Sequence, residues 1–251
     1  MTDEINALLE ELQKNPDAVA LTGAGVSTDS GIPDYRSQGG LWDRYHPITF
    51  QEFLACEDSR REYWRRKKEV YPAIRAARPG PVHNTLKRLE DLGILKGIIT
   101  QNIDGLHTRA GSRKVVEIHG TTLQTICLEC GKTSPFETAL EAFTQTGECP
   151  RCHACEGLLK PNTISFGQAL DPGTLHQAVD WVQQTALLLC IGSSLVVEPA
   201  ASLPRYAKRA RAKVILINRE ATPLDSLADR VIHTELGPFF SSVLERLPTP
   251  G

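Results

Sequence analysis

Four short runs of apolar residues recur along the chain, and each run ends in small or polar residues. The runs cover about residues 17–21, 94–99, 186–191 and 213–217, and segments with helical spacing of apolar residues separate them. Runs that are apolar at nearly every position are typical of strands covered on both faces. Strands that alternate with helices predict an α/β fold with a doubly wound parallel sheet, and 251 residues suffice for one such domain with a small added module.

The residues directly after these runs are the first candidates for chemistry. They read Gly-Ala-Gly at 23–25, Gln-Asn-Ile-Asp at 101–104, Gly-Ser-Ser at 192–194 and Asn-Arg-Glu at 218–220. The carboxyl ends of parallel strands meet at one edge of a sheet, where α/β proteins bind ligands. A polar loop with an Asn or Asp helix cap explains any one of these segments. One shared crevice explains all four.

The first of these segments is a glycine-rich turn that is expected to open a helix. Glycine allows close backbone approach, and the N–H groups at a helix start attract phosphate. Thr28 stands where the dinucleotide fingerprint has its third glycine, so a standard hydride-transferring Rossmann domain is not favoured. At this point the segment can be interpreted either as a nucleotide-binding site or as a tight turn that needs glycines. In the loop that follows, Asp34 and Arg36 could contact a pyrophosphate or only each other.

The cysteines predict a metal site. Cys127 and Cys130 form one Cys-x-x-Cys pair, and Cys149, Cys152 and Cys155 form two overlapping pairs some twenty residues later. Two such pairs indicate a structural zinc ribbon, in which four thiolates leave no open position for catalysis. Because no secretory signal or membrane-length apolar segment is evident, we expect a cytoplasmic protein with reduced thiols. The isolated Cys56 and Cys190 are expected in the core.

Charge argues against nucleic acid as a partner. The formal net charge is -2, which gives no global attraction to phosphate backbones. The segment 49–78 is predicted to be helical and carries a basic run from Arg60 to Lys68, which is better explained as a solvated helix face. We therefore expect no membrane association and no direct binding of nucleic acid.

Taken together and in this order, the motifs resemble those of the sirtuins, a family of NAD-dependent protein deacylases. The resemblance spans about residues 18–236. It rests on Gly23-Ala24-Gly25-Val26-Ser27, Gly31-Ile32-Pro33-Asp34-Tyr35-Arg36, Thr100 to His107, His119-Gly120, the cysteine pairs, Lys160-Pro161, Phe166-Gly167, Gly192-Ser193-Ser194-Leu195 and Asn218. It implies a single catalytic domain with a Rossmann-like part at about 1–120 and 160–251, a helical insertion at about 49–78 and a zinc module at about 121–159.

The resemblance also implies an activity and its residues. Sirtuins split nicotinamide from NAD and transfer the acyl group of an acylated lysine to ADP-ribose, and deacetylation is the expected reaction. His119 matches the general base, a role that suits histidine near neutral pH, and Asn102 matches a second catalytic residue. The implied NAD-binding residues are Gly23, Ala24, Gly25, Ser27, Thr28, Asp34, Tyr35, Arg36, Gln101, Asn102, Ile103, Asp104, His119, Gly192, Ser193, Ser194, Asn218, Glu220 and Leu236.

Acyl-lysine is expected to add as a strand between two protein segments. Phe166 and Gly167 would line one side, and Val196 and Val197 the other. Spacing to Lys160-Pro161 favours Cys127, Cys130, Cys152 and Cys155 as the zinc ligands, while Cys149 with Cys152 is the other possible register. The chain departs from the family pattern at Gln168, where a glutamate is usual, and at Ser193, where a threonine is usual; both departures keep hydrogen-bonding capacity.

Three alternatives stay open. Tyr63-x-x-Arg66 fits a pattern of sirtuins that remove succinyl or malonyl groups, and an arginine is a good carboxylate partner, but the match is short and the segment is rich in arginine. Mono-ADP-ribosyl transfer to protein would use the same NAD contacts. A non-catalytic zinc protein that senses NAD would lack turnover altogether.

Overall fold

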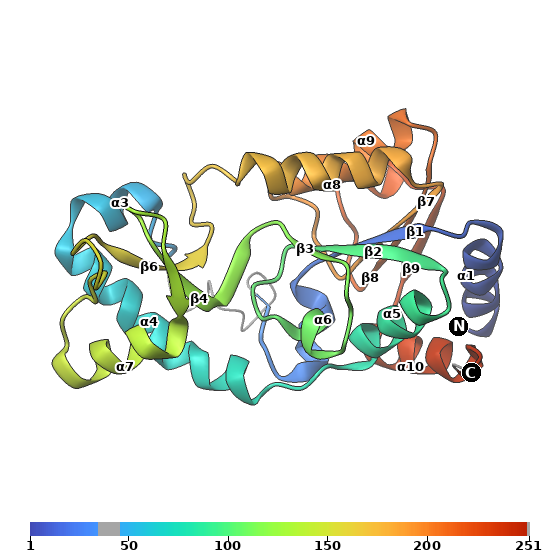
Figure 1. Cartoon of the computed structure of the whole chain (residues 1–251). Helices are drawn as coiled ribbons and strands as arrows, with labels where there is room; N and C mark the ends of the chain where they lie inside the picture. The colour runs from blue at the N-terminus through green and yellow to red at the C-terminus, as the bar shows by residue number, and fades with distance from the viewer. Residues whose placement is uncertain (35–45, 250–251) are drawn as a thin grey trace.

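The computed structural model describes residues 1–34 and 46–249, which form two sheets with helices packed around them (Figure 1). The larger sheet has the strand order β3-β2-β1-β7-β8-β9, and all of its neighbouring strands are parallel. Its strands are β1 (Ala18–Thr22), β2 (Leu95–Thr100), β3 (Val115–Glu117), β7 (Leu187–Ile191), β8 (Lys213–Asn218) and β9 (Arg230–His233). The predicted doubly wound parallel sheet is confirmed.

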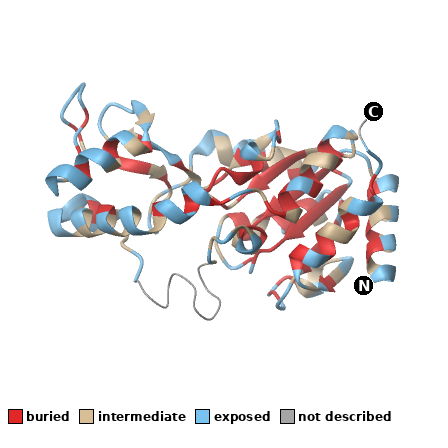
Figure 2. Ribbon diagram, turned by 90° about the horizontal axis from the view of Figure 1, so that it is seen from below, coloured by how far each residue is buried: buried red, intermediate tan, exposed pale blue. Residues whose placement is uncertain are grey.

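Helices cover both faces of this sheet, which explains why its strands are apolar throughout. In β1, Ala18 and Ala20 belong to one core, and Val19 and Leu21 belong to the other. The helices of the first core are α1 (Thr2–Lys14), α5 (Pro81–Asp91) and α10 (Leu236–Arg246), and those of the second are α8 (Pro172–Gln184) and α9 (Leu203–Arg209). Figure 2 shows the buried strands between helices whose outer faces are exposed.

The smaller sheet is antiparallel, with the order β5-β4-β6, and it lies at one end of the molecule (Figure 1). Its strands are β4 (Gly120–Cys127), β5 (Thr133–Pro135) and β6 (Leu159–Thr163), and the helices α3 (Phe50–Ala55), α4 (Glu57–Ala76) and α7 (Phe136–Thr146) lie beside it. Trp64 of α4 stacks on Phe136 of α7 with ring centroids 5.7 Å apart. This aromatic cluster gives the small sheet a core of its own.

The strand order places a crevice at the centre of the large sheet. From β1 the chain continues outward through β2 to β3, whereas β7, β8 and β9 continue outward on the other side. The order therefore reverses between β1 and β7, and ligands of doubly wound sheets bind at such a switch point. The glycine-rich turn after β1 and the Gly-Ser-Ser segment after β7 both lie at this switch point.

Several local predictions need correction. The helix that the glycine-rich turn opens is a 3₁₀ helix, η1 (Ala24–Ser30), and the segment between β7 and β8 begins with a 3₁₀ turn, η2 (Ala200–Ser202), before α9. Cys190 is buried as expected, but Cys56 is exposed because it lies at the N-cap of α4. Within the described ranges, no helix combines the length and apolar character that crossing a bilayer requires.

Candidate active site and metal centre

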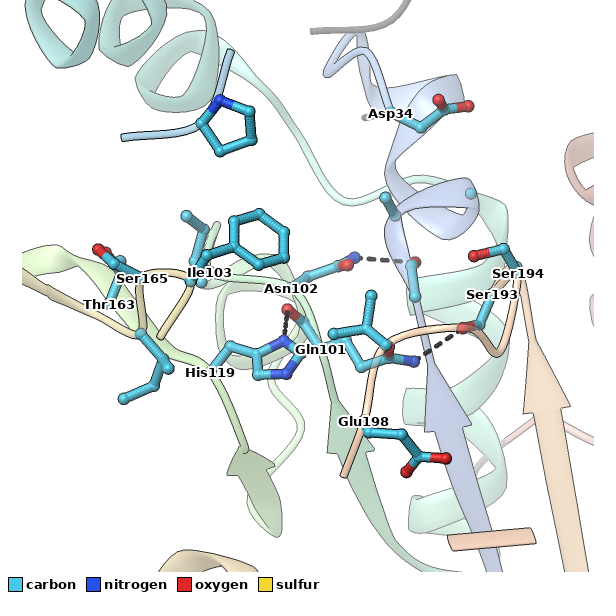
Figure 3. A pocket seen from close by; sticks show the side chains of 18 of the residues that line it. Asp34, Gln101, Asn102, Ile103, His119, Thr163, Ser165, Ser193, Ser194 and Glu198 are labelled. Carbon is cyan, nitrogen blue, oxygen red and sulfur yellow. Dashed lines mark hydrogen bonds between the residues drawn. The ribbon is translucent and has the colours of Figure 1, made fainter. Parts of the chain in front are cut away.

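A cavity of about 790 Å³ opens at the switch point, a size typical of small-molecule sites. Its wall combines the ends of β1, β2, β7 and β8 with residues of α4 and the segment after β6. Figure 3 shows Gln101, Asn102 and His119 on one side of the cavity and Ser193 and Ser194 on the other. Residues far apart in sequence thus converge on one space.

Glycines let the ends of β1 and β7 approach closely. The N–H of Gly23 donates to the Ile191 carbonyl at 3.0 Å, and that of Gly25 donates to the Gly192 carbonyl at 2.9 Å. A Cβ atom on Gly23 would lie 2.7 Å from the Gly192 carbonyl oxygen and from Ser193 Cβ, closer than such atoms can approach. The two turns therefore form one backbone-lined floor.

A buried hydrogen-bond network fixes the side chain of Asn102. Its Nδ2 donates to the Gly23 carbonyl and to Ser27 Oγ, both at 3.1 Å. Ser27 Oγ in turn donates to Asp104 Oδ2 at 2.7 Å, and Asp104 Oδ1 accepts from the N–H of Leu106 at 2.8 Å. Because both protons of the Asn102 amide have partners within the protein, its Oδ1 acceptor is left for the cavity.

His119 stands between the two sheets, after β3 and directly before β4. Its Nδ1 lies 3.0 Å from the Gln101 carbonyl oxygen (Figure 3). A carbonyl only accepts hydrogen bonds, so Nδ1 carries the proton and Nε2 of the neutral ring has a free lone pair. Burial lowers the pKa of His119, although the bond to Gln101 favours the charged form. The ring therefore has the tautomer and the protonation state of a general base.

The segment after β7 is hydrogen-bonded to the segment after β2. Gln101 Nε2 donates to Ser193 Oγ at 2.8 Å (Figure 3), and Ser193 Oγ also accepts from the N–H of Leu195 at 3.2 Å. The hydroxyl that replaces the usual threonine thus links the ends of β2 and β7. The departure at Ser193 keeps its hydrogen-bonding function.

Four cysteines gather at the end of the small sheet. The sulfur atoms of Cys127, Cys130, Cys152 and Cys155 all lie within 4.8 Å of one another, with Sγ–Sγ distances of 3.5 Å and 3.7 Å in two of the pairs. Zn–S bonds of about 2.3 Å in a tetrahedron require sulfur atoms about 3.8 Å apart. The cluster therefore fits a structural zinc ion. Cys149 is not part of it, which agrees with the register that the spacing favoured.

Comparison with known proteins identifies the family of this arrangement. Residues 23–199 match the model of the Sir2 family. The chain belongs to this family. It is 40% identical to an NAD-dependent protein deacetylase of Thermodesulfovibrio yellowstonii over 97% of this chain and 95% of the relative. It is 46% identical to an NAD-dependent protein deacetylase of Rhodopseudomonas palustris over 87% of both chains.

Solved structures of other sirtuins share the whole fold. One, described as a structural basis for the mechanism and regulation of Sir2 enzymes, has a TM-score of 0.87 and 39% identity and covers 98% of both chains. Another, a Sir2 protein bound to a p53 peptide and NAD⁺, has a TM-score of 0.87 and 35% identity and covers 96% of this chain and 97% of that one. The sirtuin fold therefore extends over nearly the full chain.

Most residues that the sequence assigned to NAD or substrate line the cavity of this sirtuin. They are Gly23, Ala24, Gly25, Thr28, Asp34, Tyr63, Arg66, Gln101, Asn102, Ile103, His119, Phe166, Gly167, Gly192, Ser193, Ser194, Val197, Asn218, Glu220 and Leu236. Ser27 and Asp104 are not among the lining residues, because they lie in the buried network that holds Asn102. Val196 is exposed and is not a lining residue either. Tyr35 and Arg36 lie outside the described residues.

Two lysines near Tyr63 were not among the predicted site residues. Lys67 lines the cavity one helical turn after Tyr63, with Nζ 5.4 Å from the centroid of the Tyr63 ring. The fully buried Lys160 lies 5.7 Å from the same centroid and donates to the carbonyls of Pro161 and Thr163. Burial opposes ionisation of the Tyr63 phenol, but the positive charges of Lys67 and Lys160, together with hydrogen bonds to Thr163 and Ser165, lower its pKa to about 7. The i, i+4 spacing of Tyr63 and Lys67 places both on one face of α4, whereas the basic run from Arg60 to Lys68 had been interpreted as a solvated face.

Proposed function

We propose that this sirtuin is an NAD-dependent protein lysine deacylase that acts chiefly on acetyl-lysine. It would transfer the acyl group to ADP-ribose, release nicotinamide and leave free lysine. The observation that carries the proposal is the state of His119, whose free Nε2 lies in the same cavity as the glycine turn and Asn102. The deacetylases of T. yellowstonii and R. palustris support the same activity.

The side chains divide the work as follows. NAD, consumed as a substrate, supplies a ribose whose bond to nicotinamide breaks when the amide oxygen of the acyl-lysine attacks the anomeric carbon. Asn102 would present its Oδ1 to the ribose region, held in that orientation by Gly23 and Ser27. His119 Nε2 would then accept a proton from a ribose hydroxyl, which attacks the former acyl carbon. Addition of water and departure of the lysine amine complete the transfer.

The acyl-lysine peptide would bind between Phe166-Gly167 and Val196-Val197. Phe166 and Val196 are 45% and 49% exposed, so both apolar residues are accessible to a peptide. The N–H of Phe50 donates to the Phe166 carbonyl at 2.8 Å, and Gln51 Nε2 donates to the Gly167 carbonyl at 3.1 Å. These hydrogen bonds from α3 hold the Phe166-Gly167 segment in place, so that a peptide strand can add beside it.

The deciding experiment combines the purified chain with an acetyl-lysine peptide and NAD labelled in its adenine. We expect free nicotinamide, deacetylated peptide and label in O-acetyl-ADP-ribose, all measured by mass spectrometry. Label that stays on protein would favour mono-ADP-ribosyl transfer instead. If NAD bound without any turnover, the chain would be an NAD-sensing zinc protein and the proposal would be wrong.

A second candidate substrate has a carboxylate on its acyl group, as succinyl-lysine and malonyl-lysine do. Tyr63, Arg66 and Lys67 line the cavity together, so a phenol and two cations face the same space. Glu62 accepts from Arg66 Nε at 2.6 Å, and hydrogen bonds from Arg65 and Arg66 lower the pKa of Glu62 to about 2. An acidic acyl group would therefore compete with an ionised glutamate for Arg66.

Replacing Arg66 by methionine tests this candidate. Loss of a charge-assisted hydrogen bond should lower kcat/KM for a succinyl-lysine peptide by roughly 10- to 100-fold relative to an acetyl-lysine peptide. The matched control is Arg65→Met, because Arg65 also contacts Glu62 but is not a lining residue of the cavity. Equal losses on both peptides in Arg66→Met would reject acidic-acyl recognition by this residue.

A further inference from the structure

Two histidines lie beneath the site without entering it. His83 of α5 is 0% exposed, and His107 of α6 (Leu106–Arg109) is 2% exposed. Their ring centroids are 4.7 Å apart. Each ring has one nitrogen with a hydrogen bond and one buried nitrogen without a partner in the part of the chain that the structure describes. Buried polar atoms are rarely left unpaired, so this pair requires an explanation.

The partners define which nitrogen of His83 carries the proton. The backbone N–H of Gly80 donates to His83 Nδ1 at 3.1 Å. Nδ1 is therefore the acceptor, and the proton of the neutral ring lies on Nε2. Nε2 is the nitrogen without a partner. His83 thus has an unused buried donor.

His107 has an unused hydrogen-bond acceptor instead of an unused donor. Its Nε2 lies 3.0 Å from Thr22 Oγ1, and Thr22 Oγ1 donates its only proton to Thr100 Oγ1 at 2.9 Å. Nε2 of His107 must therefore be the donor, and Nδ1 is a bare acceptor. Nδ1 is the nitrogen that lacks a partner. One ring thus has an unused donor and the other an unused acceptor, and the two ring centroids are 4.7 Å apart.

We propose that His83 Nε2–H is hydrogen-bonded to His107 Nδ1, directly or through one buried water molecule, and that the two histidines are positioning residues for Asn102. The completed relay runs from Gly80 through His83, His107 and Thr22 to Thr100, and every donor points the same way. Thr100 Oγ1 also accepts from the backbone N–H of Asn102 at 3.1 Å. The relay therefore connects the start of α5 to the residue that presents an amide oxygen to the cavity.

The electrostatics of the pair agree with two neutral rings. Burial lowers the pKa of His83 to about 4, although the charge of Asp104 opposes the shift, and burial lowers the pKa of His107 well below its usual value. A protonated His83 would place an N–H against the N–H of Gly80 and break the relay at its first bond. Neutral rings keep each link intact at neutral pH.

The role in catalysis rests on the proposed function, and a matched pair of variants tests it. His83→Gln keeps the relay, because a glutamine at this helix position can accept from the Gly80 N–H and still donate onward. His83→Met has a similar size but neither group. We expect kcat for deacylation to fall by about 10- to 100-fold in His83→Met, as a small misplacement of a reacting group costs this much. KM for the acyl peptide should not change, and His83→Gln should restore kcat.

The proposal is overturned by a folded His83→Met protein with unchanged kcat, or by equal losses of kcat in both variants.

A second measurement requires neither a variant nor an activity assay. In the ¹⁵N-labelled wild-type protein at neutral pH, ring nitrogen–proton correlations should show both His83 and His107 as neutral Nε2–H tautomers. A proton on Nδ1 of His107, or a doubly protonated ring, would disprove the relay. Because these spectra do not depend on turnover, they test the relay even if the deacylase proposal is wrong.

Discussion

Replacing His119 by alanine is expected to lower kcat for deacylation by about 10²- to 10⁴-fold, the usual contribution of a general base. The imidazole is held by one hydrogen bond to the Gln101 carbonyl, and its free Nε2 lies in the cavity. Its removal should leave the fold intact, because the ring is only partly buried. Steady-state rates and circular dichroism measure the two effects. His176→Ala is the matched control, since His176 is exposed on α8 and is not a lining residue of the cavity.

The pH profile of the wild type supplies an independent check on His119. A base acts in its neutral form, so kcat/KM decreases as the pH falls through the pKa of the group. Because burial lowers the pKa of His119 below 6.5, activity should be level through neutral pH and should decline only on the acidic side of that value. The acidic decline should disappear in the residual activity of His119→Ala. Wild-type activity that halves above pH 7 would assign the titration to another group.

Replacing Cys155 by serine is the second change with a large expected effect. Structural zinc sites bind with roughly 10–16 kcal/mol in zinc-finger peptides, which is energy that the folded module depends on. Loss of one thiolate should release the zinc, lower the melting temperature and abolish deacylation, because β6 leads from the module to the cavity wall. Atomic absorption and thermal unfolding report these effects.

Cys149 offers the matched control for the metal site. It is half-buried and packs against the core of the small sheet, but it is not one of the four gathered sulfurs. Cys149→Ser should therefore keep one zinc per chain and lose only the small packing contribution of a thiol. Zinc loss in Cys149→Ser alone would show that the overlapping pair of Cys149 and Cys152 holds the metal.

The strands of the large sheet were predictable where they are long and buried on both faces. β1, β2, β7 and β8 each appear as an apolar run because helices cover both sides. β3 has only three residues, which is too short for a periodic signal. β4 and β6 carry threonine, glutamine, lysine and asparagine, and Thr122, Thr125 and Lys160 among them are buried. Their composition gave no apolar run to detect.

The site residues at the strand ends were predictable from the sequence. The features that depend on contacts between distant segments were not. Polar residues after β1, β2, β7 and β8 pointed to the cavity because parallel strands end at one edge. The burial of Lys160 beside Tyr63 depends on how β6 meets α4, which no local pattern encodes. The tautomers of His83 and His107 depend on partners at Gly80 and Thr22, so they follow only from the assembled structure.

The position of His119 between the two sheets has a mechanical consequence. The chain leaves the large sheet after β3, passes through His119 and enters the small sheet at Gly120, where a φ of +73° and the nearby Asn162 carbonyl exclude any side chain. The N–H of Ile164 donates to the His119 carbonyl at 2.9 Å, so the returning strand is fastened at the same place. Two crossings of the chain between the sheets therefore meet at His119, and this hydrogen bond ties the end of the large sheet to the small sheet, whose far end is formed by α7 (Figure 1). His119 is thus anchored from both sheets, which restricts its displacement relative to either one.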